Sequence, residues 1–321
     1  MRKLATIIAF SSCLFLTACS HKIKTDTSLI YTMDTVVTLT IYNCDDSKTH
    51  FNKIKEIYKE VENVSDDYKS GNGAISVYDL NNSREALVSD ILLDLLKESV
   101  KVYEDTSGCF NPYIGRLSHK WKESIKENKI LDDSIIKEEL SIMKDTKIVF
   151  DENKVSIIGD GNIDLGAIAK GYATKKAKEY LESNNVKSYY IDAGKSSICL
   201  GDKDSLDLSV GLVKPYDKGY IGIIKGKNMA ISCSSPENQH VVIDDNIYHH
   251  LLNPFNGYPS NIFDSVYVFN DNPLLGDAYS TAIFNMDLDT AISFSKEKNI
   301  NILLYKGDSI IYKSEGVNIY E

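Results

Sequence analysis

The sequence has little of what builds metal clusters or nucleic-acid surfaces. Its six cysteines are scattered singly among 321 residues, without a Cys-x-x-Cys pair, and this argues against a zinc site. Its 36 basic residues form no long cluster and are outnumbered by 46 acidic ones, for a formal net charge of −10. A surface of that sign repels a phosphate backbone, so nucleic acid is not an expected partner.

Long apolar runs are also lacking, except in the first twenty residues. Arg2 and Lys3 precede the almost wholly apolar or small stretch 4–17, which is too short for a bilayer span and has secretory proportions. The following Cys19 completes a sequence that resembles a bacterial lipobox, LTAC. We therefore expect residues 1–18 to be a lipoprotein signal peptide, and lipid on Cys19 to anchor the exported protein to the outer face of the bacterial cytoplasmic membrane. A plain signal peptide is the alternative.

Four further cysteines remain, Cys44, Cys109, Cys199 and Cys233. An exported location permits disulfides. Four cysteines allow three complete pairings, and the sequence does not choose between them. Buried free thiols are the alternative that we favour.

The first half of the chain combines a strand with two helices. Polar residues 19–30 are typical of a tether, and β-branched residues 35–42 predict a strand. Apolar residues recur at helical spacing from Phe51, and a second helix should begin after an N-cap at Ser89. Between these helices, 68–82 is polar with two glycines, which favours a loop.

The second half is rich in short strands. Two helices are expected, over about 167–184 and from 277 to about 284, the latter with a continuation over 291–298 as an option. Strands joined by short turns favour antiparallel pairing, and so an α+β fold of mostly antiparallel sheets with packed helices. The predicted strands are 155–158, 188–192, 206–213, 220–224, 229–233, 240–243, 265–269 and 300–305. We expect 31–321 to form a single compact catalytic unit.

The first candidate motif is the segment 159–173, GDGNIDLGAIAKGYA. A strand ends, glycines turn the chain, and Asp164 precedes a predicted helix that carries Lys170 in its early turns. A helix N-terminus offers N–H groups and positive potential to an anionic phosphate. An N-capping aspartate with a surface lysine is the simpler alternative.

The second motif is GDAYSTA, residues 276–282. Asp277 and Thr281 are four residues apart, which places a carboxylate and a hydroxyl on one helical face. Mg²⁺ favours such oxygen ligands together with water and substrate phosphate. Helix capping and plain surface exposure explain most isolated pairs of this kind.

The third motif is YHHLLNPFNGYP, residues 248–259. Its two histidines end a predicted strand beside Asn-Pro and Asn-Gly turns. Neighbours on a strand point to opposite faces, so the pair is poor metal geometry. One imidazole should face solvent, and the other should either pack or take a proton from an attacking hydroxyl.

In this order the three motifs resemble the FAD:protein FMN transferase family, often called ApbE-like. The matching segments include IDLGAIAKGYA, DAYSTA and HLLNPFNGYP, together with MDTVVTLTIY, GCFNPYIGRL and VGLVKP. The resemblance runs from about 33 to 284 and implies an ApbE-like, T-fold-like architecture in which 31–321 is the flavin transferase domain. Many family members are exported lipoproteins, which agrees with the lipobox.

The resemblance also implies roles for single residues. Asp277, Thr281 and the backbone carbonyl of Ala167 would hold Mg²⁺. His250 matches the histidine before the Pro-Gly loop. We hypothesise that it is a general base, and Asp277 is the other expected catalytic residue. The positions at which the family contacts FAD are Met33, Tyr68, Cys109, Phe110, Asn111, Asp164, Lys170 and Leu252.

The reaction implied is attack by a threonine or serine hydroxyl of an acceptor protein on the FMN phosphorus of FAD, releasing AMP. Mg²⁺ would neutralise the pyrophosphate charge that repels the incoming oxygen. Acceptors would be flavoprotein subunits of membrane electron-transfer complexes. An FAD pyrophosphatase, in which water attacks, and a non-catalytic flavin-binding lipoprotein are the alternatives.

The chain departs from the family pattern at several positions. Asp34 stands where the family has glycine, Asn111 and Asn253 stand where it has aspartate, and Lys195-Ser196 interrupts its Gly-Gly-Asp turn. A lost glycine can restrict how closely the backbone approaches a nucleotide. The metal pair is intact, so we expect activity, with flavin affinity and acceptor choice open.

Overall fold

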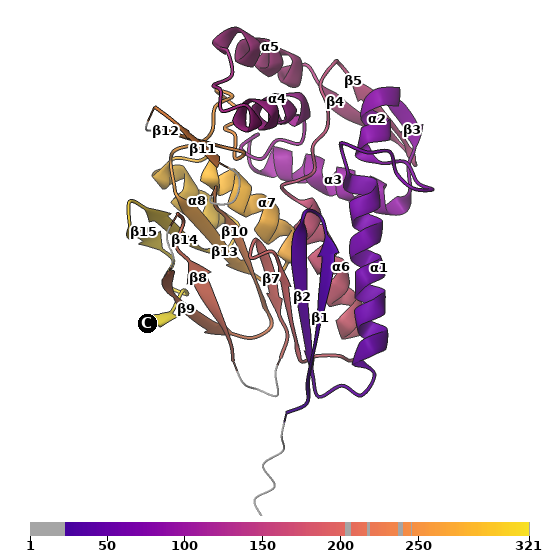
Figure 1. Cartoon of the computed structure of the whole chain (residues 1–321), viewed down its shortest axis with the longest axis vertical. Coiled ribbons are helices and arrows are strands. Elements are labelled where there is room, and N and C mark those ends of the chain that lie inside the picture. Colours follow the sequence, from indigo (N-terminus) through magenta and orange to yellow (C-terminus); the bar gives the residue numbers. More distant parts are fainter. Residues whose placement is uncertain (1–22, 203–206, 217–218, 237–239, 245, 321) are drawn as a thin grey trace, which may run out of the picture.

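The computed structural model describes residues 23–320, apart from 203–206, 217–218, 237–239 and 245. Its central feature is an eight-stranded sheet in the order β1-β2-β6-β7-β10-β13-β14-β15, antiparallel throughout (Figure 1). The strands are β1 (Thr25–Thr32), β2 (Thr35–Tyr42), β6 (Tyr189–Ala193), β7 (Ser197–Leu200), β10 (Met229–Ser234), β13 (Ser265–Asn270), β14 (Asn301–Lys306) and β15 (Ser309–Lys313). The expected α+β class is therefore confirmed.

The central strands are apolar on both faces because layers cover the sheet from both sides. In β13, Val266 and Val268 join the main core, whereas Tyr267 and Phe269 join a second core on the opposite face. Side chains alternate along a strand, so a continuous apolar sequence supplies two cores at once.

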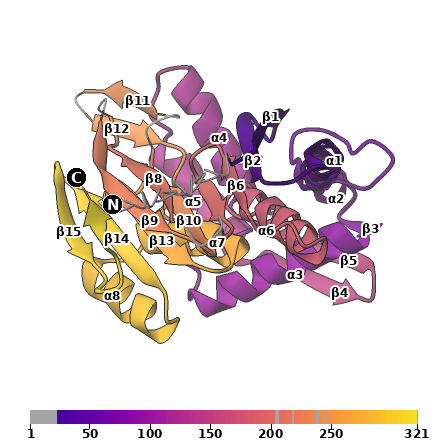
Figure 2. The same cartoon turned by 90° about the horizontal axis from the view of Figure 1, so that it is seen from below.

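Helices cover one face of the sheet (Figures 1 and 2). The contacting pairs include α1 with α6, α6 with α7, and α7 with β10 and β13. Buried Ile54, Tyr58 and Val61 of α1 lie in the same core as Val37 and Leu39 of β2. The helices with their bounds are α1 (Ser47–Ser65), α3 (Asp90–Asp105), α6 (Ala169–Ser183), α7 (Pro273–Phe284) and α8 (Leu288–Glu297).

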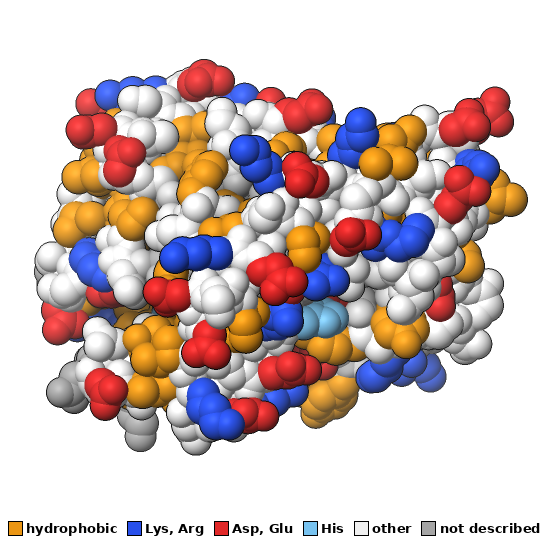
Figure 3. All heavy atoms as spheres, turned by 90° about the horizontal axis from the view of Figure 1, so that it is seen from above, with side chains coloured by type: hydrophobic (Ala, Val, Ile, Leu, Met, Phe, Trp, Pro, Cys, Tyr) orange, Lys and Arg blue, Asp and Glu red, His pale blue; other side chains and the backbone are white. Residues whose placement is uncertain are grey.

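Smaller units complete the fold. A three-stranded sheet, β8 (Leu208–Val213), β9 (Tyr220–Gly226) and β16 (Ile319–Tyr320), contributes to the second core. The others are α2 (Val77–Ser83), α4 (Gly115–Lys126), α5 (Asp133–Lys144), a sheet of β3 (Glu85–Leu87), β5 (Lys154–Ile158) and β4 (Lys147–Asp151), and the hairpin β11 (His240–Ile243) with β12 (Asn246–His249). Figure 3 shows acidic, basic and apolar side chains interspersed over the upper end of the molecule.

A third apolar cluster ties α4 and α5 to the third motif. Leu117, Trp121 and Ile136 pack with Leu252, and the Trp121 indole N–H donates to Gly257 O at 2.7 Å. Gly257 has φ +79°, a conformation that glycine adopts without strain. The 253–257 turn is thus fixed against α4.

Several sequence predictions need correction. Strand β1 begins at Thr25, so the expected tether over 19–30 is too long, and α2 lies at the end of the predicted loop 68–82. Residues 291–298 belong largely to a separate helix, α8, rather than to a continuation of α7. Helices α4 and α5 were missed.

The predicted signal peptide and Cys19 lie outside the described residues. Among the residues that the structure describes, no helix is both long and apolar enough to cross a membrane. No disulfide joins Cys44, Cys109, Cys199 and Cys233 among the described residues, and of these four thiols only Cys199 is buried.

Candidate active site

The first and second motifs meet where α6 approaches α7. Asp277 is buried in α7, and its Oδ2 accepts a hydrogen bond from the Gly171 N–H at 2.8 Å. Gly171 permits this approach, because a Cβ there would lie 2.5 Å from Asp277 Cβ and 2.6 Å from Pro273 O. The α7 helix begins one turn earlier, at Pro273, with Asn272 as its side-chain cap.

This contact changes the expected role of the α6 N-terminus. Ala169 N–H donates to Leu165 O, and Gly171 N–H is paired with Asp277. Two donors of the first turn are therefore already used, and the Asp277 carboxylate takes the position that favours an anion. These two donors are therefore not available to a substrate phosphate.

Burial raises the pKa of the Asp277 carboxyl to about 6, against the opposing effects of the Lys170 charge and the Gly171 N–H. Lys170, in the first turn of α6, is therefore close enough to act on Asp277 electrostatically. A carboxyl held in this range binds a cation readily once it loses its proton.

Thr281 lies one turn beyond Asp277. Its Oγ1 is 3.2 Å from Ser234 Oγ, which is also 2.9 Å from Ser280 Oγ. Two buried oxygens of this region, Ser235 Oγ and Asn285 Oδ1, make no hydrogen bond among the described residues. Buried polar atoms are normally satisfied, so the region is suited to bind a polar ligand, water or a cation.

The Asn285 amide connects α7 to the predicted FAD-binding stretch 109–111. Its Nδ2 lies 3.2 Å from Cys109 O and 3.3 Å from Thr281 O. Phe110 is buried in the main core, and Asn111 Oδ1 accepts from Tyr113 N–H at 2.9 Å. The stretch is thus held at both ends.

Asp164 completes the link between these segments. Its backbone N–H donates to Pro112 O at 2.9 Å, and its Oδ1 accepts from Gly166 N–H at 2.7 Å. Asp164 is therefore part of a turn and is not the N-cap of α6, which is preceded by Ile168 without a side-chain cap. The half-buried Ala167 packs against the main core between Asp164 and α6.

The loop that carries Asp164 is anchored by residues that the sequence did not single out. The buried Asn81 donates to Ile163 O at 2.9 Å and accepts from Ile163 N–H at 2.8 Å. Arg84 donates to the carbonyl oxygens of Gly159 and Gly161. These contacts join positions about 80 residues apart, for which no local pattern exists.

Two other predicted FAD contacts lie on turns. Met33 and Asp34 form the β1–β2 turn with φ of +51° and +54°, and the Met33 N–H donates to Glu62 Oε1 at 2.5 Å. Tyr68 is 46% exposed and stacks on His119 of α4. Lys122, also of α4, interacts with both Tyr68 and Asp164.

The two histidines of the third motif differ in burial. His249 is buried, its Nδ1 accepts from Leu251 N–H, and its Nε2 lies 3.0 Å from Ser260 O, which requires a proton on Nε2. Burial, then the neighbouring His250, lowers the pKa of His249 to about 4. His249 therefore packs as a neutral ring, while His250 is half-buried. Leu252 buries its side chain beside Trp121, and its backbone forms an antiparallel bridge with Pro259.

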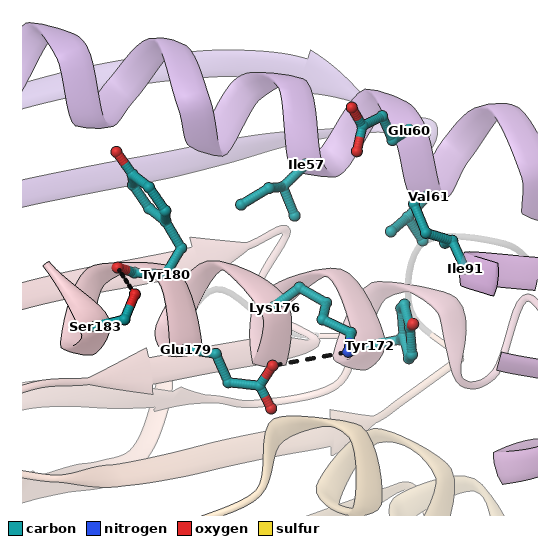
Figure 4. A pocket seen from close by; sticks show the side chains of 9 residues that line it. All are labelled: Ile57, Glu60, Val61, Ile91, Tyr172, Lys176, Glu179, Tyr180 and Ser183. Carbon is teal, nitrogen blue, oxygen red and sulfur yellow. Dashed lines mark hydrogen bonds and ion pairs between the residues drawn. The ribbon is translucent and has the colours of Figure 1, made fainter. Parts of the chain in front are cut away.

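Two cavities have linings that do not include Asp277, Gly171 or Thr281. One, of about 400 Å³, is a groove between α1 and α6 without any predicted site residue (Figure 4). The other, of about 390 Å³, is lined by parts of the third motif, among them Tyr248, Asn253 and Asn256. The candidate site is therefore a meeting of loops and helix ends rather than either of these hollows.

The fold and these contacts define an α+β protein that joins a buried carboxylate, a threonine and a turn aspartate from segments more than 100 residues apart in the sequence. The chain belongs to the ApbE family, whose model matches residues 33–304. It is 23% identical over 272 residues to the FAD:protein FMN transferase of Klebsiella pneumoniae (strain 342), covering 83% of this chain and 84% of the relative. It is 24% identical to the FAD:protein FMN transferase of Haemophilus influenzae, and the match covers 95% of this chain and 93% of that relative.

Solved structures confirm the fold. The ApbE protein of Thermotoga maritima superposes with a TM-score of 0.79 at 22% identity, covering 93% of this chain and 97% of that one. The flavin transferase ApbE of Vibrio cholerae superposes with a TM-score of 0.77 at 21% identity, covering 92% of this chain and 98% of that one.

The raised pKa of Asp277 has a consequence for stability without metal. The folded-state value of about 6 exceeds the ordinary 3.8, so the buried charge costs stability above pH 6, and the cost fades as the pH falls through 6. Asp277→Asn keeps an acceptor for the Gly171 N–H. At pH 8 the free energy of unfolding of this variant should be about 3 kcal/mol higher than that of the wild type. At pH 5 the gain should fall to about half. Urea unfolding in EDTA measures both, and a pH-independent difference would contradict the assignment.

Proposed function

We propose that this chain is an FAD:protein FMN transferase, which moves FMN from FAD to a threonine or serine hydroxyl of an acceptor protein and releases AMP. The observation that carries the proposal is the junction of Asp277 with Gly171, one residue from Lys170. It unites two motifs typical of the family, and the family's curated relatives carry this name.

Mg²⁺ is the metal that we propose for this site. Asp277 offers Oδ1 while Oδ2 is paired with Gly171, Thr281 offers a hydroxyl one turn later, and the Ala167 carbonyl is the third candidate. An all-oxygen set suits Mg²⁺, and the unpaired oxygens near Thr281 support a polar occupant. When bound, the metal would neutralise charge on the pyrophosphate and on the departing AMP.

The chain's own residues would bind and orient the dinucleotide. Lys170 provides a positive charge beside Asp277, where the pyrophosphate would lie. Met33, Tyr68, the 109–111 stretch, Asp164 and Leu252 would contact FAD around it. His250 would take the proton from the acceptor hydroxyl, because both ring nitrogens of His249 already make hydrogen bonds to the backbone.

The main alternative is an FAD pyrophosphatase that uses the same residues and gives free FMN and AMP. A non-catalytic flavin-binding lipoprotein is the other, and the buried Asp277 argues against it, since simple capture does not require a cation-binding carboxylate. Acceptors, we propose, are exported flavoprotein subunits of membrane electron-transfer complexes.

Covalent transfer tests the function directly. Purified protein with FAD, Mg²⁺ and a candidate acceptor should add the mass of FMN to the acceptor and release AMP. Asp277→Asn should lower this rate by at least about 100-fold, because the developing charge is no longer stabilised. Intact-mass spectrometry and AMP quantification check both. FMN and AMP without acceptor labelling would establish the hydrolase, and FAD binding without turnover the capture protein.

Replacement of His250 tests the proposed base. His250→Gln should lower kcat by about 100-fold or more, in the usual range for a general base, while KM for FAD changes little. His240→Gln, at the start of β11, is the matched control and should keep its rate. An unchanged kcat in His250→Gln would remove the role.

The N-terminal sequence supports a further part of the proposal, that the mature protein is exported and anchored by lipid on Cys19. Cys19→Ser in the full chain should block lipid attachment and move the protein from the membrane to the soluble exported fraction. Cell fractionation and intact mass of the membrane form check this. Continued membrane attachment of the variant would refute the anchor.

A further inference from the structure

Helix α4 brings two side chains against Tyr68. The His119 imidazole stacks on the phenol ring with centroids 4.2 Å apart and planes inclined by 16°. The Lys122 ammonium lies 4.8 Å from the same centroid. Residues three apart lie on one side of a helix, so both groups reach Tyr68 from α4.

The stacked pair is itself fixed. His119 Nε2 lies 2.6 Å from Asp67 Oδ2, and the Asp67 side chain is only 11% exposed. The Tyr68 backbone N–H donates to Asp66 Oδ1 at 2.8 Å. The loop is therefore joined to α4 through Asp67, and its own hydrogen bond to Asp66 orders the backbone at Tyr68.

Lys122 connects this pair to the turn aspartate. Burial lowers the pKa of Lys122, but the charge of Asp164, the hydrogen bond to Tyr68 and the charge of Asp67 outweigh it and raise the pKa above its ordinary value. The ammonium therefore stays charged between Tyr68 and Asp164, two positions at which the family contacts FAD.

We propose that His119 and Lys122 are positioning residues that hold the Tyr68 ring against α4, so that it presents a fixed surface to the isoalloxazine ring of FAD. Tyr68 remains 46% exposed, which leaves area for a planar ligand. A ring fixed before binding loses less conformational entropy when the ligand stacks on it. The inference rests on the proposed function, since it assumes that Tyr68 contacts the flavin.

Two replacements of His119 separate stacking from hydrogen bonding. His119→Gln keeps a donor for Asp67 but removes the ring, and should raise the Kd for FAD by about 3- to 10-fold and reduce the quenching of bound flavin fluorescence. His119→Phe keeps a ring and should return Kd to within about twofold of wild type. At saturating FAD, kcat should stay within about twofold in both.

Lys122→Met should raise Kd by a similar 3- to 10-fold factor. Lys126→Met, in the last turn of α4 and exposed, is the matched control and should bind FAD as the wild type does. Thermal unfolding of each variant confirms that it is folded, and a fall in kcat without a change in Kd would overturn the positioning role.

Tyr68→Ala distinguishes failure of this inference from failure of its premise. An unchanged Kd in Tyr68→Ala would show that Tyr68 does not contact flavin, which removes the premise. A raised Kd in Tyr68→Ala with normal binding by His119→Gln would overturn the positioning role and leave the proposed function standing. His119→Phe behaving like His119→Gln would overturn the stacking argument.

Discussion

The hydrogen bond from Gly171 N–H to the Asp277 carboxylate is the contact on which the site depends. It ties the first turn of α6 to α7 across 106 residues of sequence, inside the main core. A buried carboxylate is costly unless it is paired, and one N–H with a nearby lysine compensates only in part, since the pKa remains raised. The fold thus retains a buried charge that is only partly compensated, which is a common feature of functional sites.

From this contact a closed series of bonds defines the site. Thr281 and Asn285 extend it along α7 to Cys109, the 109–112 stretch leads to Asp164, and the chain returns from Asp164 to α6. Each connection runs through backbone groups or buried amides, which hold position more firmly than exposed side chains. The site therefore depends on long-range pairing of short segments, and moving one segment would displace the rest.

Helices and strands with a clear local sequence signal were predicted, and those without such a signal were not. Periodicity found α1, and the Ser89 cap marked the start of α3. Helix α4 has no side-chain cap at Ile114, and β1 alternates exposed with half-buried residues at a sheet edge, so neither gave a clear signal. Missing α4 also meant missing His119 and Lys122. The Asn81 contact with Ile163 forms only when distant segments meet, and no single sequence displays it.

The departures from the family pattern alter charge more than backbone shape. Gly194 is retained, and a Cβ there would lie 2.1 Å from Thr35 Oγ1. Lys195 has φ +63° and Asp34 has φ +54°, so both hold a left-handed conformation that is easy for glycine and costs other residues about 1 kcal/mol. Hairpin pairing imposes these conformations, and Asp192 Oδ1 supports one by accepting from Lys195 N–H. Because the backbone keeps both turns despite the larger side chains, Asp34 adds a carboxylate to the β1–β2 turn and Lys195 adds an ammonium to the β6–β7 turn.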